Sequence, residues 1–149
     1  MVLALIAISS MLVISNFDFL HGGFIKKPVD LILRKAVYGA RYQAAKTNRP
    51  VFLSFDSETR SFEIRNESGE LLGEGFNSEV DVLTVEFFPI KPEGGIDTPP
   101  FYEPASNSVD RVPFHPDRSS VPFLAELQSE GVLLSLRFDP FSNASFAEK

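Results

Sequence analysis

The chain has 149 residues, no cysteine, two histidines and a formal net charge of −6. Without cysteine it can form neither disulfides nor thiolate metal sites, and two histidines leave little material for any other metal site. A net negative charge is the opposite of what a nucleic-acid partner requires, so we expect none. The length suits one modest domain. Fifteen phenylalanines without tryptophan predict phenylalanine-rich β packing.

The first 17 residues, MVLALIAISSMLVISNF, carry no charge, and Asp18 ends this run. A run of about 17 residues is at the short end of what spans a bilayer as a helix. A secretory signal peptide has basic residues before its apolar core and a small-residue cleavage site after it, and neither pattern is visible. We therefore expect residues 1–20 to form a retained, single-pass transmembrane helix.

Residues 21–49 are expected to continue this helix after a kink between Gly22 and Pro28. From Val29 to Thr47 apolar residues recur every three or four positions, which is typical of an amphipathic helix. The sequence Asn48-Arg49-Pro50 suits its end. The residues expected to pack this helix on a sheet are Val29, Leu33, Ala36, Val37, Ala40 and Ala44. The charged residues expected to lie elsewhere on the helix are Asp30, Arg34, Lys35 and Arg41.

From Pro50 on, the apolar period changes to two, which predicts β-strands. Residues 51–55 and 61–65 predict a hairpin, and longer strands are expected at residues 80–88 and 131–138. Shorter apolar segments, which suggest further strands, lie at residues 71–72, 111–115 and 121–127. Residues 89–108 are rich in proline and predict a long exposed loop, whereas residues 142–149 form a polar tail. A helix followed by strands in hairpin-like succession predicts an α+β fold, with an antiparallel sheet within residues 50–149.

Three parts of the chain together resemble type IV pilin-like proteins, and most of all the H-type minor pseudopilins of type II secretion systems. Residues 1–8 (MVLALIAI) are similar to the apolar run that follows a glutamate near the family's mature N-terminus. Residues 33–46 resemble the second half of its long helix. Residues 112–120 (VPFHPDRSS) and 138–143 (FDPFSN) resemble its Phe-x-Pro-Asp-Gly-x-Ser segment and its closing Asp-Pro-x-Thr-Gly. Arg118 and Asn143 stand where the family has glycine.

The resemblance implies a structural subunit without enzymatic activity or cofactor. Its N-terminal helix would sit in the bacterial inner membrane, with the globular domain in the periplasm. That helix would then move into the core of a pseudopilus or pilus. The partners implied are other pilin-like subunits and the inner-membrane assembly platform. The resemblance assigns filament-core contacts to Met1, Val2, Leu3, Leu5, Ile6, Ile8, Met11 and Leu12.

The family's basic leader, the glycine before its cleavage point and its glutamate have no counterpart in the sequence. Without them, prepilin peptidase could not process this chain. We therefore expect Met1 to be an internal methionine of a longer reading frame. Taken alone, Lys26, Lys27, Arg34 and Lys35 after the apolar run favour a cytoplasmic C-terminal domain; the resemblance favours a periplasmic one.

Other chemistry has weaker support in the sequence. The tripeptide His115-Pro116-Asp117 matches that of J-domain co-chaperones, but prolines and β-prone residues flank it here. Ser54, Ser119 and Ser120 have neither a nucleophile-elbow motif nor a convincing histidine partner. Five acidic residues could pair for acid–base catalysis or bind calcium: Asp56, Glu58, Asp81, Glu86 and Asp97. Roles in turns or on the solvated surface are favoured for them. Two alternatives stay open: a membrane-anchored enzyme, and a secreted β-rich binding module with a cleaved leader.

Overall fold

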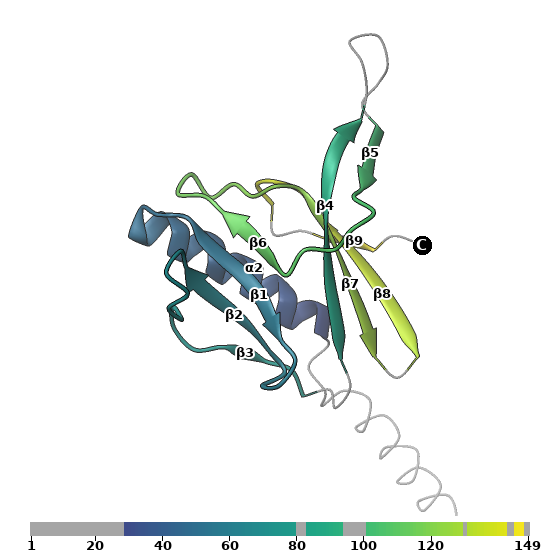
Figure 1. Ribbon diagram of the computed structural model, residues 1–149, viewed down its shortest axis with the longest axis horizontal. Coiled ribbons are helices and arrows are strands. Elements are labelled where there is room, and N and C mark those ends of the chain that lie inside the picture. Colours follow the sequence, from purple (N-terminus) through teal and green to yellow (C-terminus); the bar gives the residue numbers. More distant parts are fainter. Residues whose placement is uncertain (1–28, 80–82, 94–100, 130, 143–144, 148–149) are drawn as a thin grey trace, which may run out of the picture.

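The computed structural model describes residues 29–79, 83–93, 101–129, 131–142 and 145–147. Within these residues the protein is α+β, as predicted, with the helix α2 (Val29–Thr47) and two antiparallel sheets (Figure 1). The first sheet has the order β3-β2-β1-β6, formed by Phe76–Asn77, Ser61–Asn66, Val51–Asp56 and Arg111–Phe114. The second has the order β5-β4-β7-β8-β9, formed by Phe101–Pro104, Thr84–Glu93, Phe123–Ser129, Val132–Phe138 and Ser145–Ala147.

The helix α2 has the bounds that its apolar period predicts, and its end is built as the sequence suggests. Asn48 adopts a left-handed conformation with φ of 50°. The Arg49 amide then donates to the Ala44 carbonyl at 3.3 Å. This is the backbone pattern of a Schellman cap, in which the residue after the helix turns left-handed and the next amide reaches back.

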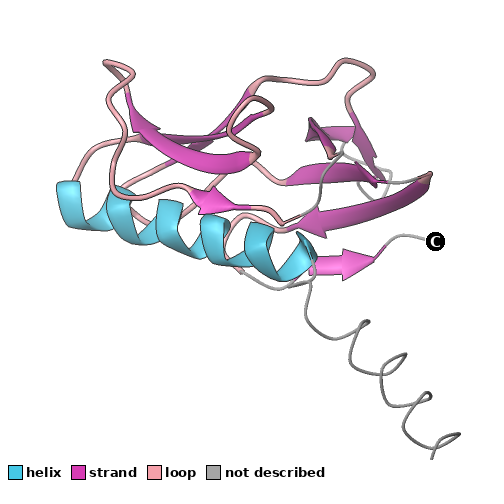
Figure 2. Ribbon diagram, turned by 90° about the horizontal axis from the view of Figure 1, so that it is seen from below, coloured by secondary structure: helices cyan, strands magenta, loops and turns pink. Residues whose placement is uncertain are grey.

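The helix lies along one side of the molecule, where it packs against β1, β2, β3 and β6 (Figure 2). Small residues on its inner face allow this close approach. At Gly39, an added Cβ would lie only 3.0 Å from Phe76 Cζ and 3.1 Å from Ile64 Cδ1. The first sheet thus uses the helix as the cover for one of its faces.

A cluster of phenylalanine rings joins the two sheets. Phe123 on β7 stacks on Phe138 of β8 at a centroid distance of 4.9 Å and meets the edge of Phe87 on β4 at 5.9 Å. It also meets Phe114 on β6, in the first sheet, at 6.4 Å. All four rings belong to the same buried core cluster as the inner face of α2. Four of the fifteen phenylalanines thus pack together where the sheets meet.

The prediction that residues 89–108 form an irregular loop is wrong for residues 89–93 and 101–104, which are strands, while residues 94–100 lie outside the described part. Strand β4 continues through Pro89 to Glu93 and pairs with β5, from Ile90↔Pro104 to Glu93↔Phe101. Pro104 is tolerated on β5 because β5 is an edge strand. The pairing of β4 with β7 ends at Pro89↔Phe123. Pro92 lacks the N–H that would point towards the β7 side, but β7 no longer pairs with β4 at this position, so no hydrogen bond is lost.

Other differences concern short strands. The two-residue strand β3 was not predicted, and Leu71 forms only an isolated bridge with Arg65. The polar tail contains β9, which pairs with the end of β8. Of the strand expected at residues 80–88, residues 80–82 lie outside the described part, and β4 begins at Thr84.

The predicted anchor and kink, residues 1–28, also lie outside the described residues. Within the part that the structure describes, no helix is both long enough and apolar enough to cross a membrane.

Candidate functional site

The two predicted sets of contact residues fall in different parts of the chain. The filament-core set, Met1 to Leu12, lies outside the described residues. The helix-to-sheet set lies on one face of α2: Leu33, Ala36, Val37, Ala40 and Ala44 are buried, and Val29 packs against the core from the first turn. Ile32 shares this buried face, although the sequence analysis did not include it.

Arg41 was expected away from the packing face, and this is wrong: its side chain is only 4% exposed. Its Nη2 donates to the Asp139 carbonyl oxygen at 2.9 Å and, more weakly, to Ser120 Oγ at 3.5 Å. Its guanidinium also lies 5.9 Å from the centre of the Phe114 ring. The spacing could have revealed this burial, because position 41 follows Val37 by four residues and precedes Ala44 by three.

The rest of the Arg41 guanidinium is not satisfied. Its Nε and Nη1 atoms are shielded from solvent and have no hydrogen-bond partner. Burial lowers the pKa of Arg41, and the nearby Asp139 carboxylate partly opposes this shift. The Asp139 side chain itself caps the following turn, where Oδ1 accepts from the amides of Phe141 at 2.9 Å and Ser142 at 2.6 Å.

Arg41 lines a hollow of 160 Å³ together with Tyr38, Tyr42, Arg118 and Phe141. The two tyrosines come from the exposed side of α2, and Phe141 follows the Asp139-Pro140 turn. Arg118 comes from the connection after β6. The hollow is therefore lined by two arginines and three aromatic residues from three separate parts of the chain.

A tight turn holds Arg118 in place. The Arg118 amide donates to the His115 carbonyl, and the His115 amide donates to the Ser119 carbonyl, both at 2.9 Å. Arg118 has φ of 68°, a left-handed conformation that favours glycine. Asp117 Oδ1 accepts from the Ser119 amide and hydroxyl at 2.9 and 2.6 Å, and these hydrogen bonds lower the pKa of Asp117. The His-Pro-Asp tripeptide thus lies in a turn after a strand.

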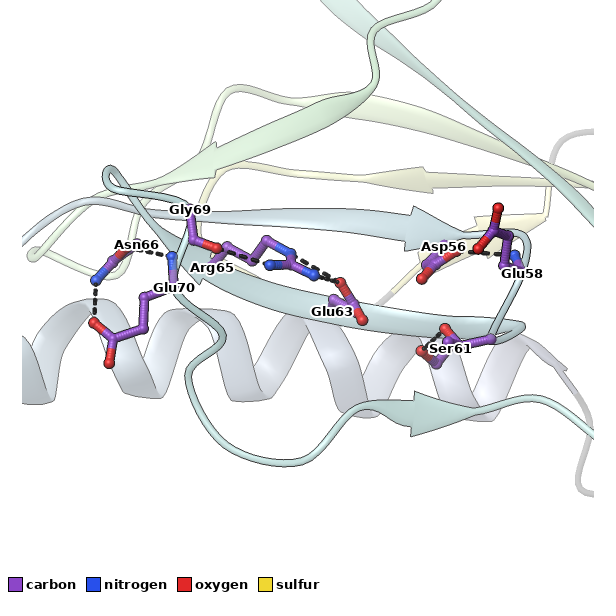
Figure 3. A network of polar contacts seen from close by, with 9 residues as sticks. Asp56, Glu58, Ser61, Glu63, Arg65, Asn66, Gly69 and Glu70 are labelled. Carbon is purple, nitrogen blue, oxygen red and sulfur yellow. Dashed lines mark hydrogen bonds and ion pairs between the residues drawn. The ribbon is translucent and has the colours of Figure 1, made fainter.

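The polar network on β2 and its following turn is, by contrast, internally paired (Figure 3). Arg65 donates from Nε to Glu63 Oε2 at 2.8 Å and from Nη1 to the Gly69 carbonyl at 2.7 Å. Asn66 and Glu70 close the turn, with the Glu70 amide 2.8 Å from Asn66 Oδ1. These contacts stabilise the turn and give it no evident chemistry.

The acidic residues considered for catalysis or calcium do not converge. Asp56 caps the β1–β2 turn by accepting from the Glu58 amide at 2.9 Å, and this bond, with one from Thr59, lowers its pKa. Glu86 is exposed on β4, while Asp81 and Asp97 lie outside the described residues. Within the described ranges, no group of three histidine or acidic side chains could hold a metal ion.

Comparisons with known proteins identified no relatives: no family model matches the chain, and neither the curated proteins nor the solved structures contain a match.

Proposed function

We propose that the protein is a minor pilin-like subunit of a type II secretion pseudopilus or a type IV pilus. In this proposal the apolar N-terminal segment is its inner-membrane anchor, and the domain built on α2 lies in the periplasm. The partners are other pilin-like subunits and the membrane platform that assembles them.

The observation that carries the proposal is the position of α2. This helix packs lengthwise on an antiparallel sheet, and in sequence it follows the uncharged run at residues 1–17. A helix that leads from an apolar segment onto a sheet is the arrangement that the pilin-like resemblance predicts.

The turn at Arg118 gives a second line of support. The resembled Phe-x-Pro-Asp-Gly-x-Ser segment has glycine at this position, and Arg118 has the left-handed φ for which glycine is the usual residue. The backbone at this position therefore has the conformation that the motif would require, although the side chain differs.

In this proposal, assembly exchanges the lipid contacts of the N-terminal helix for contacts with neighbouring helices. Both surroundings are apolar, so burial from water supplies no driving force, and shape fit and close packing must decide. In the family that the chain resembles, a glutamate directly before the apolar run would bind a neighbour's N-terminal amine.

The absence of natural cysteines allows a clean topology test. The gene, expressed from its natural locus, would carry the single substitution Glu58→Cys on the exposed β1–β2 turn. We expect a membrane-impermeant maleimide to label this cysteine once the outer membrane is permeabilised. Labelling only after the inner membrane is broken, or a mature chain that begins beyond Ser15, would contradict the proposal.

The assembly step has its own test. A photoreactive amino acid at Leu5 should form adducts with other proteins that have apolar N-terminal helices, whereas the same probe at Glu58 should not reproduce these adducts. In a strain lacking the gene, Leu5→Lys should fail to restore filament formation or protein export, and Glu58→Lys should restore it. Equal complementation by both variants would contradict a filament-core role for the N-terminal segment.

A further inference from the structure

We propose that Arg41 and Arg118 form a binding site for a carboxylate, presented by an acidic side chain of a neighbouring protein. Only the identity of this neighbour as a filament subunit rests on the proposed function. The site itself rests on the contacts of α2 and of the two turns around it.

The first step is the unsatisfied charge. Buried side-chain nitrogen and oxygen atoms are nearly always hydrogen-bonded, and an unpaired buried charge is strongly destabilising. Arg41 nevertheless leaves Nε and Nη1 without partners. Arg65 on β2, by contrast, uses Nε, Nη1 and Nη2. Arg41 is therefore a buried guanidinium with donors left for an acceptor that the described residues do not supply.

The second step is that the obvious internal acceptor is already in use. Oδ1 of the Asp139 side chain accepts hydrogen bonds from the amides of Phe141 and Ser142. The backbone carbonyl of Asp139 accepts from Arg41 Nη2, whereas its carboxylate influences Arg41 by charge alone. Turning this carboxylate towards Arg41 would leave those two amides without their acceptor. An external acceptor avoids this loss.

The third step is the chemistry of the hollow. Arg118 supplies a second guanidinium from an exposed position, and Tyr38, Tyr42 and Phe141 supply aromatic walls. Guanidinium groups bind carboxylates through short, charge-assisted hydrogen bonds. The aromatic walls suit the methylene stem on which aspartate and glutamate carry their carboxylate.

The fourth step is access. The rim is made of side chains that project into solvent: Phe141 is 72% exposed, Tyr38 61% and Tyr42 51%. Exposed side chains change rotamer in picoseconds to nanoseconds, so the rim of the hollow can rearrange without moving the strands. The Asp117 turn fixes the backbone of Arg118 at the same rim.

The charge of the chain and the size of the hollow limit what can bind there. The chain as a whole carries −6, which opposes polyanions such as nucleic acid. A hollow of 160 Å³ has room for one small anionic group and its stem. An acidic side chain on a partner protein meets both conditions.

Nuclear magnetic resonance of the arginine Nε–H groups would test the site directly. The full chain in detergent micelles would be titrated with N-acetylglutamate N′-methylamide, and the Arg41 signal would be assigned with Arg41→Lys. We expect a saturable shift of this signal, and no shift with the matched N-acetylglutamine N′-methylamide. Absence of the shift, or an equal response to the glutamine compound, would overturn the proposal.

Two exposed arginines provide matched variants that do not depend on removing the buried one. Arg118→Gln should weaken glutamate binding about tenfold, a factor equivalent to about 1.4 kcal/mol. Arg111→Gln, on β6, where the guanidinium lies 4.4 Å from the centre of the Phe52 ring, should leave the affinity unchanged. Equal affinities in both variants would overturn the role of Arg118. Tighter binding of inorganic phosphate than of the glutamate compound would overturn the assignment to a carboxylate.

The source of the carboxylate requires a measurement in cells. A photoreactive amino acid at Phe141 should capture a protein, with the adduct mapping beside an aspartate or glutamate of that protein. Arg118→Glu should abolish the adduct, and reversing the charge of the partner's acidic residue should restore it. No adduct, or an adduct insensitive to these charges, would overturn the protein source.

The two proposals can fail separately. A partner without an apolar N-terminal helix would count against the filament function and leave the carboxylate site standing. A failed titration would remove the site and leave the filament function untouched.

Discussion

The two sheets differ in what covers them. The first sheet has α2 along one face, and four successive residues of β2, Ser61 to Ile64, are buried. The second sheet has no helix on it among the described residues, and β8 changes along its length from exposed Val132 and Leu133 to buried Phe138. The first sheet is thus stabilised along its length by a helix, and the second mainly where its rings meet the first.

The largest expected effect is at the joint between the sheets. Phe123→Ala removes the ring that contacts Phe87, Phe114 and Phe138, and should lower the free energy of unfolding by about 3–5 kcal/mol. Phe141→Ala, on an exposed ring, should change it by less than about 0.5 kcal/mol. Urea denaturation of the full chain in micelles would measure both. A Phe123→Ala variant as stable as the natural chain would show that this ring does not stabilise the joint between the sheets.

An intermediate effect is expected under the helix. Ala36 is fully buried at the contact between α2 and the first sheet, so Ala36→Leu forces extra atoms into a packed space. We expect it to lower the free energy of unfolding by about 1–3 kcal/mol. The control is Lys35→Leu on the exposed side of the same helix, which should have little effect. If the two variants were equally stable, α2 would be packed more loosely on the sheet than its burial indicates.

A smaller effect, of opposite sign, is expected at Arg118, in the connection that leads from the first sheet to the second. Glycine has no Cβ to oppose the φ of 68°, so Arg118→Gly should raise the free energy of unfolding by up to about 1 kcal/mol. Asn48→Gly at the end of α2 should gain less, because asparagine tolerates the left-handed region. If the Arg118→Gly variant were less stable than the natural chain, the contacts of the arginine side chain would stabilise the fold by more than the left-handed backbone conformation costs.

The difference between the sheets also explains which parts the sequence could predict. The bounds of α2 and the β1–β2 hairpin depend on local signals: a helical period, an asparagine-proline stop and an alternating pattern. Strand β5 carries no such signal, because its partner β4 runs through prolines that usually indicate loops. Strands β3 and β9 are only two and three residues long, and they exist only as pairing partners of longer strands.

The candidate site was missed for a related reason. Arg41 was assigned to the solvent side by residue type, although its spacing places it on the packing face of the helix. Turns from distant parts of the chain close over it there. Its carbonyl partner, Asp139, lies 98 positions away in the sequence. Contacts of this kind depend on tertiary structure, and no local pattern in residues 29–47 specifies them.

The smallest expected effect is on the pH dependence of stability, and it concerns two acidic turns. Asp56 lies in the first sheet and Asp117 in the connection between the sheets. Hydrogen bonds hold the pKa of each carboxyl below its ordinary value in the folded protein. The unfolded chain therefore binds more protons below about pH 4, and stability should fall as the pH drops through that range. Asp56→Asn and Asp117→Asn should each reduce this acid dependence, measured as the difference in urea midpoint between about pH 7 and about pH 3. Added salt should change this difference in urea midpoint only slightly. The groups that lower the pKa of the two exposed carboxyls are adjacent amides and hydroxyls, and salt mainly screens distant charges. An acid dependence unchanged in both variants would place its origin in other carboxylates.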